Sequence, residues 1–476
     1  MSLHTSDYKL KERVELEVKN EMMRKAVAMA QDTIGANRQK MVDDLGNFEA
    51  WRDLAMQYRN HVLENLDAYL YQLSEKVTQN GGHVFFAATA EEASQYVLKV
   101  CQEKKAKKVV KSKSMVTEEI GVNHVLEANG IKTVETDLAE YILQLSGDKP
   151  SHIVVPAIHK DRHAIRADLE KYAGYKGTAE PSEMTAFIRN ELRPDFLTAD
   201  VGISGCNFAV AETGSACLVT NEGNMRLATS LPKTHIAVMG MERILPSFKE
   251  VDVLITMLAR SAVGAKLTGY NTWLTGPRLN GETDGPEDFH LVIVDNGRSK
   301  ALASPEFREV LRCIRCGACM NTCPAYREIG GHGYGSIYPG PIGVVISPLI
   351  GGYEEFKELP GVCTLCTGCN SVCPVRIPLA QLISKHRENL VKLGYEPFIE
   401  KLETRFFTLN NNNPALWNLT VKTGAVAAGL AIRNGHSLLE VGPVAAWTEA
   451  RDLPKPYGQS FRSWFKAQEK IKHQTK

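Results

Sequence analysis

Hydrophobic positions recur with a helical period through the first part of the chain. The stretch from Asp7 to Thr78 is charged, rich in helix-forming residues and almost free of glycine and proline. This pattern predicts two or three long amphipathic helices. We assign residues 1–80 to an N-terminal helical region that serves in packing or at an interface.

The pattern changes after Gly81-Gly82, where short apolar runs alternate with helical stretches. Such alternation predicts an α/β domain with a largely parallel sheet over residues 81–300. Helices are expected at Glu91–Lys104, from about Val116, and at Ser247–Arg260. The expected strands are His83–Ala88, Lys107–Lys111, Ile131–Glu135, His152–Ala157, Ala216–Thr220, His235–Met239 and His290–Asp295.

Two cysteine runs with one spacing follow the α/β region. The first run is Cys313-x-x-Cys316-x-x-Cys319-x-x-x-Cys323-Pro324, and the second is Cys363-x-x-Cys366-x-x-Cys369-x-x-x-Cys373-Pro374. This is the bacterial ferredoxin spacing for cubane iron–sulfur clusters, in which the fourth cysteine ligates the other cluster. We therefore predict two [4Fe-4S] clusters with crossed ligation. The first quartet is Cys313, Cys316, Cys319 and Cys373, and the second quartet is Cys363, Cys366, Cys369 and Cys323.

Other uses of these cysteines fit the sequence less well. Structural zinc also binds Cys-x-x-Cys pairs, but two tetrahedral zinc sites give no reason for a third cysteine at the same spacing. Disulfides are disfavoured because the chain begins with charged residues and shows no apolar stretch followed by a small-residue cleavage site, so a reducing cytoplasm is expected. Cys101 lies on an apolar helical face. Packing is the favoured interpretation for Cys101, Cys206 and Cys217, with a site role left open for the last two.

The cysteine runs belong to a helical, ferredoxin-like module at residues 301–385. A glycine-rich insert at Ile329–Gly352 separates them, and such an insert can bring backbone amides close to cluster sulfurs. A helix is expected from Leu379, and Asn410–Asn413 before Pro414 reads as a linker. Residues 386–476 form a C-terminal helical and tail region, expected to cover the cluster module or a partner subunit.

Composition narrows the classes of function. The chain has 476 residues, enough for about three domains, and its 56 basic and 55 acidic residues give a formal charge of +1. No overall field attracts nucleic acid, so we expect no nucleic-acid partner. The near-apolar stretch from Gly424 to Ile432 is shorter than the roughly 20 residues of a membrane-spanning helix. We expect no transmembrane segment.

Two loops in the α/β region are candidates for ligand binding. Lys111-Ser112-Lys113-Ser114 follows a strand and precedes a helix, so it could hold a carboxylate or phosphate, or simply cap the helix. A glycine-rich loop at Gly202–Asn207 leads to Glu212-Thr213-Gly214-Ser215, where Glu212 could act as a base or pair a ligand. The candidate pocket residues are Lys113, Ser114, Glu212, Thr213 and Gly214.

Other polar motifs carry weaker signals. Thr136, Asp137 and Glu140 fit helix capping better than catalysis. His159 and His163 lack a third metal ligand and stay unassigned. There is no P-loop, and Gly331-x-Gly333-x-Gly335 lacks the dinucleotide fingerprint. Because cubane clusters pass electrons singly, another component should perform any two-electron bond chemistry.

Further motifs are those of a known family: Lys113-Ser114-Met115, Glu135-Thr136-Asp137-Leu138, Glu212-Thr213-Gly214-Ser215, Thr275-Gly276-Pro277-Arg278 and the segment from Trp447 to Pro454. With both cysteine runs, they make the chain resemble the iron–sulfur B subunit of the bacterial three-protein L-lactate utilisation system. The resemblance implies that residues 81–300 are a lactate-utilisation (LUD) domain, similar in fold to the ribose-phosphate isomerase and CoA-transferase group. It transfers no mechanism, because one fold hosts many activities.

The resemblance also implies a role and two partners. The partners are a cysteine-rich protein similar to heterodisulfide reductase and glycolate oxidase subunits, and a second LUD-domain protein. We expect a non-catalytic electron-transfer subunit of a complex that oxidises L-lactate to pyruvate, so that lactate serves as carbon source. The complex is expected in the cytoplasm, with contact to the membrane only through partners. Two alternatives stay open: the LUD domain itself binds and oxidises the 2-hydroxy acid, with Glu212 as base and Lys113 on the carboxylate, or the protein is a cluster-containing redox-sensing scaffold.

Overall fold

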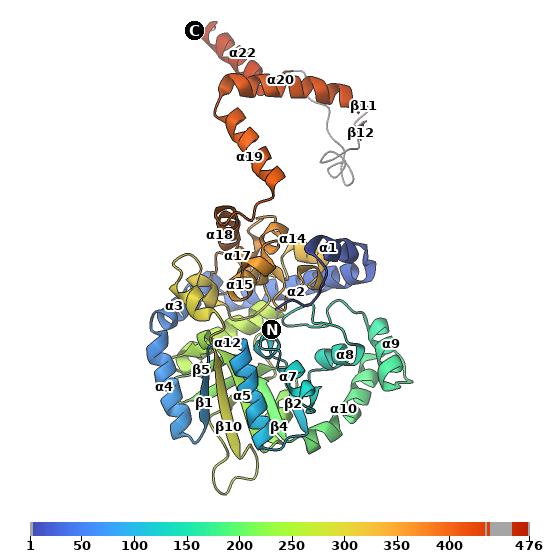
Figure 1. Cartoon of the computed structure of the whole chain (residues 1–476), viewed down its shortest axis with the longest axis vertical. Coiled ribbons are helices and arrows are strands. Elements are labelled where there is room, and N and C mark those ends of the chain that lie inside the picture. Colours follow the sequence, from blue (N-terminus) through green and yellow to red (C-terminus); the bar gives the residue numbers. More distant parts are fainter. Residues whose placement is uncertain (1–2, 434–435, 438–458, 475–476) are drawn as a thin grey trace. The chain divides into compact units, whose positions relative to one another are not determined.

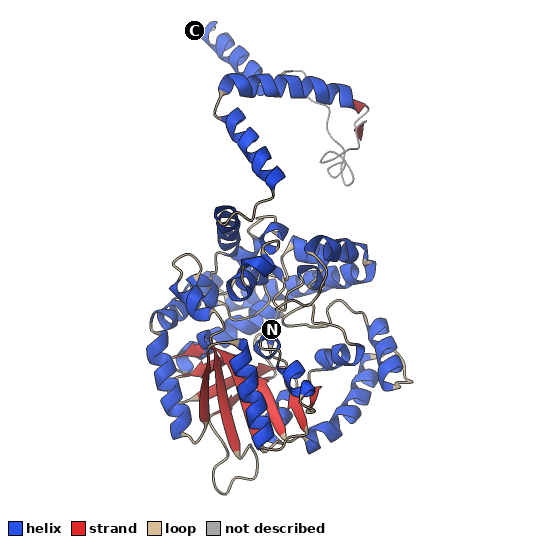
Figure 2. Cartoon of the chain, viewed as in Figure 1, coloured by secondary structure: helices blue, strands red, loops and turns tan. Residues whose placement is uncertain are grey.

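The structure is a computed structural model that describes residues 3–433, 436–437 and 459–474. The chain folds into two compact units, Met1–Leu393 and Gly394–Lys476. The first unit contains the α/β region and both cysteine runs, whereas the second is mainly helical (Figure 2).

Four helices, rather than the two or three predicted, form the N-terminal region. They are α1 (Leu10–Lys19), α2 (Glu21–Leu45), α3 (Phe48–Glu64) and α4 (Leu66–Gln79). Asparagines set two of the starts, because the side chains of Asn20 and Asn47 accept hydrogen bonds from the N–H groups of Met23 and Ala50. Each of α2, α3 and α4 buries an apolar face, as the helical period predicts.

A six-stranded, fully parallel sheet forms the centre of the α/β region. Its strands, in spatial order, are β1 (His83–Ala87), β10 (Asp288–Val294), β7 (Thr234–Gly240), β4 (Val201–Gly205), β2 (Lys108–Lys111) and β3 (Lys132–Glu135). The apolar runs predicted all of these strands except β4. They are a usable signal because a parallel strand that is buried on both faces consists of consecutive apolar residues. The predicted α/β class with a parallel sheet is confirmed.

The sheet is covered on both faces. Helices α5 (Ala90–Glu103) and α7 (Val122–Ala128) pack on one face with β4, β7 and β10. A smaller sheet and helix α12 (Phe248–Ala262) pack on the other face, in one core with α2, α3 and α4. The strands of the smaller sheet are β8 (Ile244–Leu245), β5 (Phe208–Val210), β6 (Ser215–Thr220) and β9 (Tyr270–Leu274).

Further helices complete the α/β region near β2 and β3. They enclose a separate small core that includes Val110, Val134 and Leu169. These helices are α8 (Leu138–Ser146), α9 (Arg162–Ala173), α10 (Pro181–Thr198) and α11 (Asn224–Ser230). The helix predicted near Val116 begins as α6 (Met115–Glu119), and its Val116 packs against the core of α5 and α7 instead.

The strand predicted at His152–Ala157 is wrong, because this segment is a series of bends and turns. The Nδ1 atom of His152 accepts hydrogen bonds from the N–H groups of Val154 and Val155, at 3.0 Å each, and this closes a tight turn. The apolar side chains pack beside the first cysteine run instead of in a sheet. A Cβ atom at Gly317 would lie 3.0 Å from the His152 ring and 3.3 Å from Val154.

Short helices carry the cysteine runs. The elements are α13 (Arg298–Ala303), η2 (Arg308–Arg312), α14 (Pro324–Ile329), η3 (His332–Tyr334), α15 (Gly340–Gly351), α16 (Tyr353–Phe356), η4 (Leu359–Val362), α17 (Gly368–Val372) and α18 (Leu379–Lys392). The N-terminal helices α1 and α2 lie beside α14 (Figure 1). Cysteines of both runs belong to the same buried core as α12 and strand β10. The regions 1–80, 81–300 and 301–385 therefore share one core.

The second unit contains α19 (Phe398–Asn411), α20 (Pro414–Ala431), β11 (Ile432–Arg433), β12 (His436–Ser437) and α22 (Phe461–Gln474). The predicted linker coincides with the break between α19 and α20, where the side chain of Asn413 caps α20. The segment from Trp447 to Pro454 lies outside the described residues. Among the described helices, none combines the length and the apolar character that crossing a bilayer requires.

Candidate metal centre and adjoining cavity

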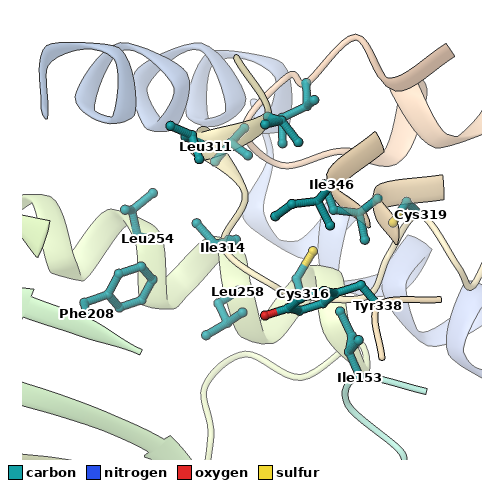
Figure 3. Packing of buried hydrophobic residues seen from close by; sticks show 14 of the residues in the cluster. Ile153, Phe208, Leu254, Leu258, Leu311, Ile314, Cys316, Cys319, Tyr338 and Ile346 are labelled. Carbon is teal, nitrogen blue, oxygen red and sulfur yellow. The ribbon is translucent and has the colours of Figure 1, made fainter. Parts of the chain in front are cut away.

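The cysteines of the first quartet line one small void. This void of about 20 Å³ is bounded by Cys313, Cys316 and Cys319 of the first run and by Cys373 of the second run. Figure 3 shows Cys316 beside Tyr338, in the packed interior of the molecule. The first three cysteines of one run and the last cysteine of the other therefore lie together.

The members of the second quartet are also neighbours. Burial raises the pKa of the Cys369 thiol, and together with the nearby Cys363, Cys323 and Cys366 it brings this pKa to about 12. Burial raises the pKa of the Cys319 thiol, and the nearby Cys369 contributes to this rise. The two groups of cysteines therefore lie next to each other, with Cys319 and Cys369 between them.

Both runs aim a backbone amide at their first cysteine. The N–H of Arg315 donates to the Sγ atom of Cys313 at 3.4 Å, and the N–H of Leu365 donates to that of Cys363 at 3.3 Å. The two donors have left-handed backbones, with φ angles of 59° and 55°. Such a conformation costs a non-glycine residue about 1–3 kcal/mol and tends to occur at ligand sites. The matching strain supports one loop geometry for both runs.

The chemistry of the sulfur donors suits a cluster. Burial raises the pKa of the Cys316 thiol, and the neighbouring Cys373 and Cys313 raise it further. Burial also raises the pKa of Cys373 to about 11. Buried thiols of this kind keep their protons at neutral pH unless a metal replaces them. The donor set therefore fits iron–sulfur clusters, which bind thiolates and can take up single electrons.

Side chains from the N-terminal helices hold the backbone of the cysteine loops. Gln31 of α2 donates to the carbonyl groups of Met320 at 2.8 Å and Cys323 at 3.2 Å. Arg52 of α3, which is 5% exposed, donates to the carbonyl groups of Cys373 at 2.9 Å and Asn370 at 2.8 Å. These bonds add side-chain donors to carbonyl groups of both cysteine loops. They fix both loops to the rest of the first unit.

The glycine-rich insert contributes to the same centre. It folds into η3 and α15 rather than an open loop, and the backbone amide of Ile342 in the first turn of α15 points to Cys319. The hydroxyl of Tyr334 in η3 lies 3.8 Å from the Sγ atom of Cys323. Hydrogen bonds to cluster sulfurs shift the reduction potential, so these donors are positioned to tune it.

A larger cavity opens at the carboxyl edge of the parallel sheet, where open α/β sheets bind their ligands. We call this space of about 280 Å³ the sheet-edge cavity. Its polar lining includes Lys113, Ser114, Asp137, Asn207, Glu222, Asn224, Glu242, Arg243, Arg298, Arg315 and Tyr338. Ile153 lines both this cavity and the void of the first quartet. The two spaces are therefore immediate neighbours.

A buried ion network forms one wall of the sheet-edge cavity. Arg298 pairs with Glu119 at 2.8 Å and with Glu242 at 2.8 Å. Burial disfavours the charge on Glu242, but Arg298, Arg243 and Arg315 outweigh it and lower its pKa to about 2. Glu242 therefore stays ionised at neutral pH.

The predicted pocket residues separate into two groups. Lys113 and Ser114 line the sheet-edge cavity, where Ser114 also caps α6. Glu212, Thr213 and Gly214 form a turn between β5 and β6 that lies against α4. The side chain of Asn80 donates to the carbonyl of Thr213 at 2.9 Å, and a Cβ atom on Gly214 would collide with the backbone of α4. This turn lines none of the cavities described here.

The weaker motifs also have defined places. Asp137 caps α8 by accepting hydrogen bonds from Ala139 and Glu140, as predicted. His159 bonds Asp148 at 3.0 Å and lies beside His332 rather than His163. Cys101, Cys206 and Cys217 are buried, as the packing interpretation predicts, although Cys206 also contacts the sheet-edge cavity.

A second cavity of about 350 Å³ lies beside α6, α7 and α8. Two carboxylates of its lining pair with the buried Lys111, Glu118 at 2.7 Å and Glu135 at 2.9 Å. Both oxygens of the buried Glu140 lack a hydrogen-bond partner among the described residues. Burial and the nearby Glu135 raise the pKa of Glu140 well above its usual range.

Sequence reasoning missed Arg243 and Arg315 as cavity residues. Arg243 follows strand β7, so its position at a strand end was a usable signal. Arg315 lies inside the first cysteine run, and nothing local indicates that its side chain reaches the LUD region. Only the fold brings the two together.

Comparison with known proteins agrees with this arrangement. Residues 70–294 match the LUD domain, residues 309–377 match the 4Fe-4S dicluster domain, and residues 385–470 match the model described as lactate utilisation protein B, C-terminal. The class of protein is therefore an iron–sulfur protein that combines a LUD domain with two [4Fe-4S] clusters. This confirms the predicted cofactors.

The chain belongs to the lactate utilisation protein B family. It is 56% identical to lactate utilization protein B of Geobacillus thermodenitrificans (strain NG80-2), over 96% of each chain. It is 54% identical to the protein of that name from Bacillus licheniformis, over 100% of each chain. A protein of Escherichia coli (strain K12) named "Uncharacterized electron transport protein YkgF" is 66% identical over 99% of each chain. The family resemblance of the sequence motifs is thus confirmed.

Proposed function

We propose that this chain is the iron–sulfur electron-transfer subunit in the oxidation of L-lactate to pyruvate. The observation that carries the proposal is the pair of neighbouring cysteine groups, each reached by a backbone amide in a strained loop. The full-length similarity to proteins named for lactate utilisation supports the substrate. Both observations point to electron transfer rather than to bond chemistry in this chain.

The ligands follow the crossed pattern. In our proposal the first quartet binds one cluster, and the shared void of its four cysteines supports this assignment. The second quartet binds the other cluster, and the mutual influence of Cys369 with Cys363, Cys366 and Cys323 supports it. Cys319 and Cys369 then lie between the two clusters, which keeps the electron path between them short.

The electron balance requires a partner. Oxidising L-lactate breaks the C2–H bond and the hydroxyl O–H bond, and it releases two electrons and two protons. A cubane cluster carries one electron at a time, so a two-electron acceptor must break the C–H bond elsewhere. We assign that step to a partner subunit. The clusters of this chain then pass the two electrons on singly to a one-electron acceptor.

Two partners are proposed, a cysteine-rich subunit similar to heterodisulfide reductase and a second LUD-domain protein. The second unit of the chain supports a role in assembly, because it exposes large apolar side chains such as Phe398, at 80% exposure, and Phe406, at 62%. Any contact with the membrane would be made through these partners.

Metal analysis of anaerobically purified protein tests the proposal. We expect about eight iron and about eight acid-labile sulfide per chain, and an EPR signal from two interacting clusters after reduction. Mixed with the two partners and L-lactate, the protein should become reduced, whereas L-lactate alone should leave its absorbance unchanged. A colourless preparation, or one that contains only zinc, would contradict the proposal.

The alternative of lactate oxidation within the LUD domain is less well supported. Its proposed base, Glu212, lies in the turn against α4, whereas Lys113 lines the sheet-edge cavity. Bleaching of the clusters by L-lactate in the isolated protein would favour this alternative. A redox-sensing scaffold would instead leave lactate oxidation by the three proteins intact when a cluster is removed.

A further inference from the structure

The sheet-edge cavity contains more buried positive charge than its own carboxylates balance. Arg298 is fully matched, because it binds both oxygens of Glu119 and one oxygen of Glu242, each at 2.8 Å. Only the second oxygen of Glu242 remains for two further guanidinium groups. It lies 3.7 Å from Nε of Arg243 and 3.9 Å from Nη2 of Arg315, which is too far for a hydrogen bond in either case.

The guanidinium groups of these two arginines make no hydrogen bond to any described residue. The side chain of Arg243 is only 10% exposed. The Nη1 atom of Arg315 is buried without a partner, and its guanidinium lies 4.4 Å above the ring of Tyr338. A buried charged donor without a partner is strongly destabilising. Both arginines line the cavity, so an anion bound there would satisfy them.

The remaining charges of the lining do not supply that anion. Asp137 is committed to the N-terminus of α8, where it accepts two backbone hydrogen bonds. Burial and the neighbouring Asp137 raise the pKa of Glu222. Lys113 adds another positive charge and donates to the carbonyl of Val154. Cys313, which would be a thiolate on a bound cluster, also lies near Arg243 and Arg315, but it does not line the cavity. No side chain of the lining supplies the anion, so an anion from outside the chain can bind there.

The rest of the lining indicates what kind of anion fits. The Oδ1 atom of Asn224 is a buried acceptor without a partner, so it can receive a hydroxyl proton. Apolar side chains, among them Leu258 and Val263, form another wall and suit a short carbon chain. Two guanidinium groups can hold a carboxylate, for which their planar fork is well shaped.

We propose that the sheet-edge cavity binds a small hydroxycarboxylate anion, with its carboxylate on Arg243 and Arg315 and its hydroxyl on Asn224. The choice of a hydroxycarboxylate deepens the proposed function and rests on it, whereas the anion site itself rests only on the unpaired donors. No bond is broken at this site. The anion is bound and released unchanged.

The position of the site couples it to the first quartet. Arg315 lies between Cys313 and Cys316 in the sequence, and Ile153 separates the cavity from the void of the quartet. Figure 3 shows Ile153, Cys316 and Tyr338 close to one another. A negative charge held there opposes the addition of an electron to the adjacent cluster, and by reciprocity reduction of the cluster weakens binding of the anion.

Calorimetry on the full-length, cluster-containing protein under anaerobic conditions tests the site. We expect L-lactate to bind to the wild type, acetate to bind more weakly because it lacks the hydroxyl, and inorganic phosphate to bind more weakly than L-lactate. Arg243→Gln should weaken L-lactate binding about tenfold or more, the usual effect of losing a hydrogen bond to a charged group. Arg226→Gln removes an exposed arginine of α11 outside the cavity lining and should leave binding unchanged.

A second variant tests the site independently, in case Arg243→Gln does not fold. Val263→Phe reduces the cavity from its apolar wall without changing any charge, and it should also abolish binding. In the wild type, L-lactate should lower the reduction potential of one of the two clusters, and this shift should be absent in Val263→Phe. Tighter binding of phosphate than of L-lactate, equal binding by Arg243→Gln, or binding without a change in potential would overturn the inference.

The iron and sulfide content of the same samples separates this inference from the proposed function. Failure of the wild type to bind L-lactate while it contains both clusters would overturn the anion site and leave electron transfer intact. Binding of L-lactate by protein that lacks iron in every preparation would support the anion site and contradict the electron-transfer role.

Discussion

The two cysteine runs have the same spacing but different surroundings. In the first run, Cys316 and Cys319 are each 8% exposed and belong to the main core. In the second run, Cys366 is exposed, and its neighbour Leu365 is 37% exposed. The common spacing therefore predicts the same ligand pattern for both runs, whereas tertiary packing determines how deeply the cysteines of each run are buried.

The charges around the two runs differ as well. Arg38 lies near Cys316 and Cys373, and Arg243 and Arg315 lie near Cys313. These cations favour the addition of an electron to a cluster bound by the first quartet, which lies beside the sheet-edge cavity. The exposed Cys366 instead marks the side at which a partner can approach. We infer that electrons are exchanged with partners at the second run and that the first run responds to the LUD domain.

Removal of a buried ligand should have the largest effect. Cys316→Ser should cost the first quartet its cluster, reduce the iron content from about eight to about four per chain, and abolish electron flow in the three-protein assay. Iron analysis and the rate of pyruvate formation measure both effects. Cys101→Ala removes a buried cysteine outside both quartets and should keep the full iron content. An unchanged rate in Cys316→Ser would contradict the role of the clusters as the electron path.

Controlled exposure to air should distinguish the two sites. The second quartet contains an exposed cysteine, so oxygen should remove its cluster first and leave about half of the iron. Timed iron analysis with EPR of the reduced protein would follow the loss. In Cys316→Ser, which keeps only the second cluster, the remaining iron should be lost in the fast phase. Loss of both clusters at one rate in the wild type would remove the distinction drawn here.

The attachment of the cysteine loops to the N-terminal helices should be measurable as stability. Arg52→Leu removes the charged donor from the buried carbonyl group of Cys373 and from the partly buried carbonyl group of Asn370. The free energy of unfolding should fall by about 3–6 kcal/mol. Arg24→Leu breaks the exposed pair with Glu328 and an exposed bond to the carbonyl of Val18, and it should cost less than about 1 kcal/mol. Equal losses in denaturant titrations of the two variants would contradict the proposed attachment.

A buried histidine connects the two halves of the cluster module and should produce the smallest effect. His386 of α18 bonds the carbonyl of Val345 in α15 at 2.9 Å and the hydroxyl of Tyr353 at 2.7 Å. Burial lowers the pKa of His386 to about 4, so the folded protein keeps the ring neutral. The unfolded chain, with a pKa of about 6.5, binds the proton more readily.

The stabilising contribution of His386 is therefore complete above about pH 6.5 and is lost as the pH falls towards about 4. The loss should amount to at most about 3 kcal/mol in the free energy of unfolding. His386→Gln should flatten this pH dependence, whereas His163→Gln, which changes an exposed histidine, should not. An identical pH slope in His386→Gln and in the wild type would rule out this link.

Local patterns in the sequence predicted the features that depend on neighbours along the chain. The apolar runs predicted strands such as β7 and β10, and Asp137 was placed correctly at a helix start. The repeated cysteine spacing predicted the two clusters without any knowledge of the fold. Such signals are readable because one residue and its next few neighbours determine the local geometry.

Features that depend on tertiary packing were missed or misplaced. The apolar residues at His152–Ala157 looked like a strand, but they pack beside Gly317 of the first run. Glu212 and Lys113 both follow strands, yet β5 and β2 belong to different sheets and separate them. Arg315 reaches the LUD region from inside a cysteine run. None of these arrangements has a local signature.

The bond from Arg52 to the carbonyl of Cys373 joins residues 321 positions apart. A ribosome must therefore have released nearly four-fifths of the chain before the helix that arrives first can hold the loop that arrives late. The proposed first quartet is complete only when Cys373 has been made, and the second quartet only when Cys369 has been made, so both clusters acquire their last ligand near that point. Iron and sulfide can therefore be inserted only late in the synthesis of this protein. Until then, the N-terminal helices lack the cysteine loops that they contact in the folded protein.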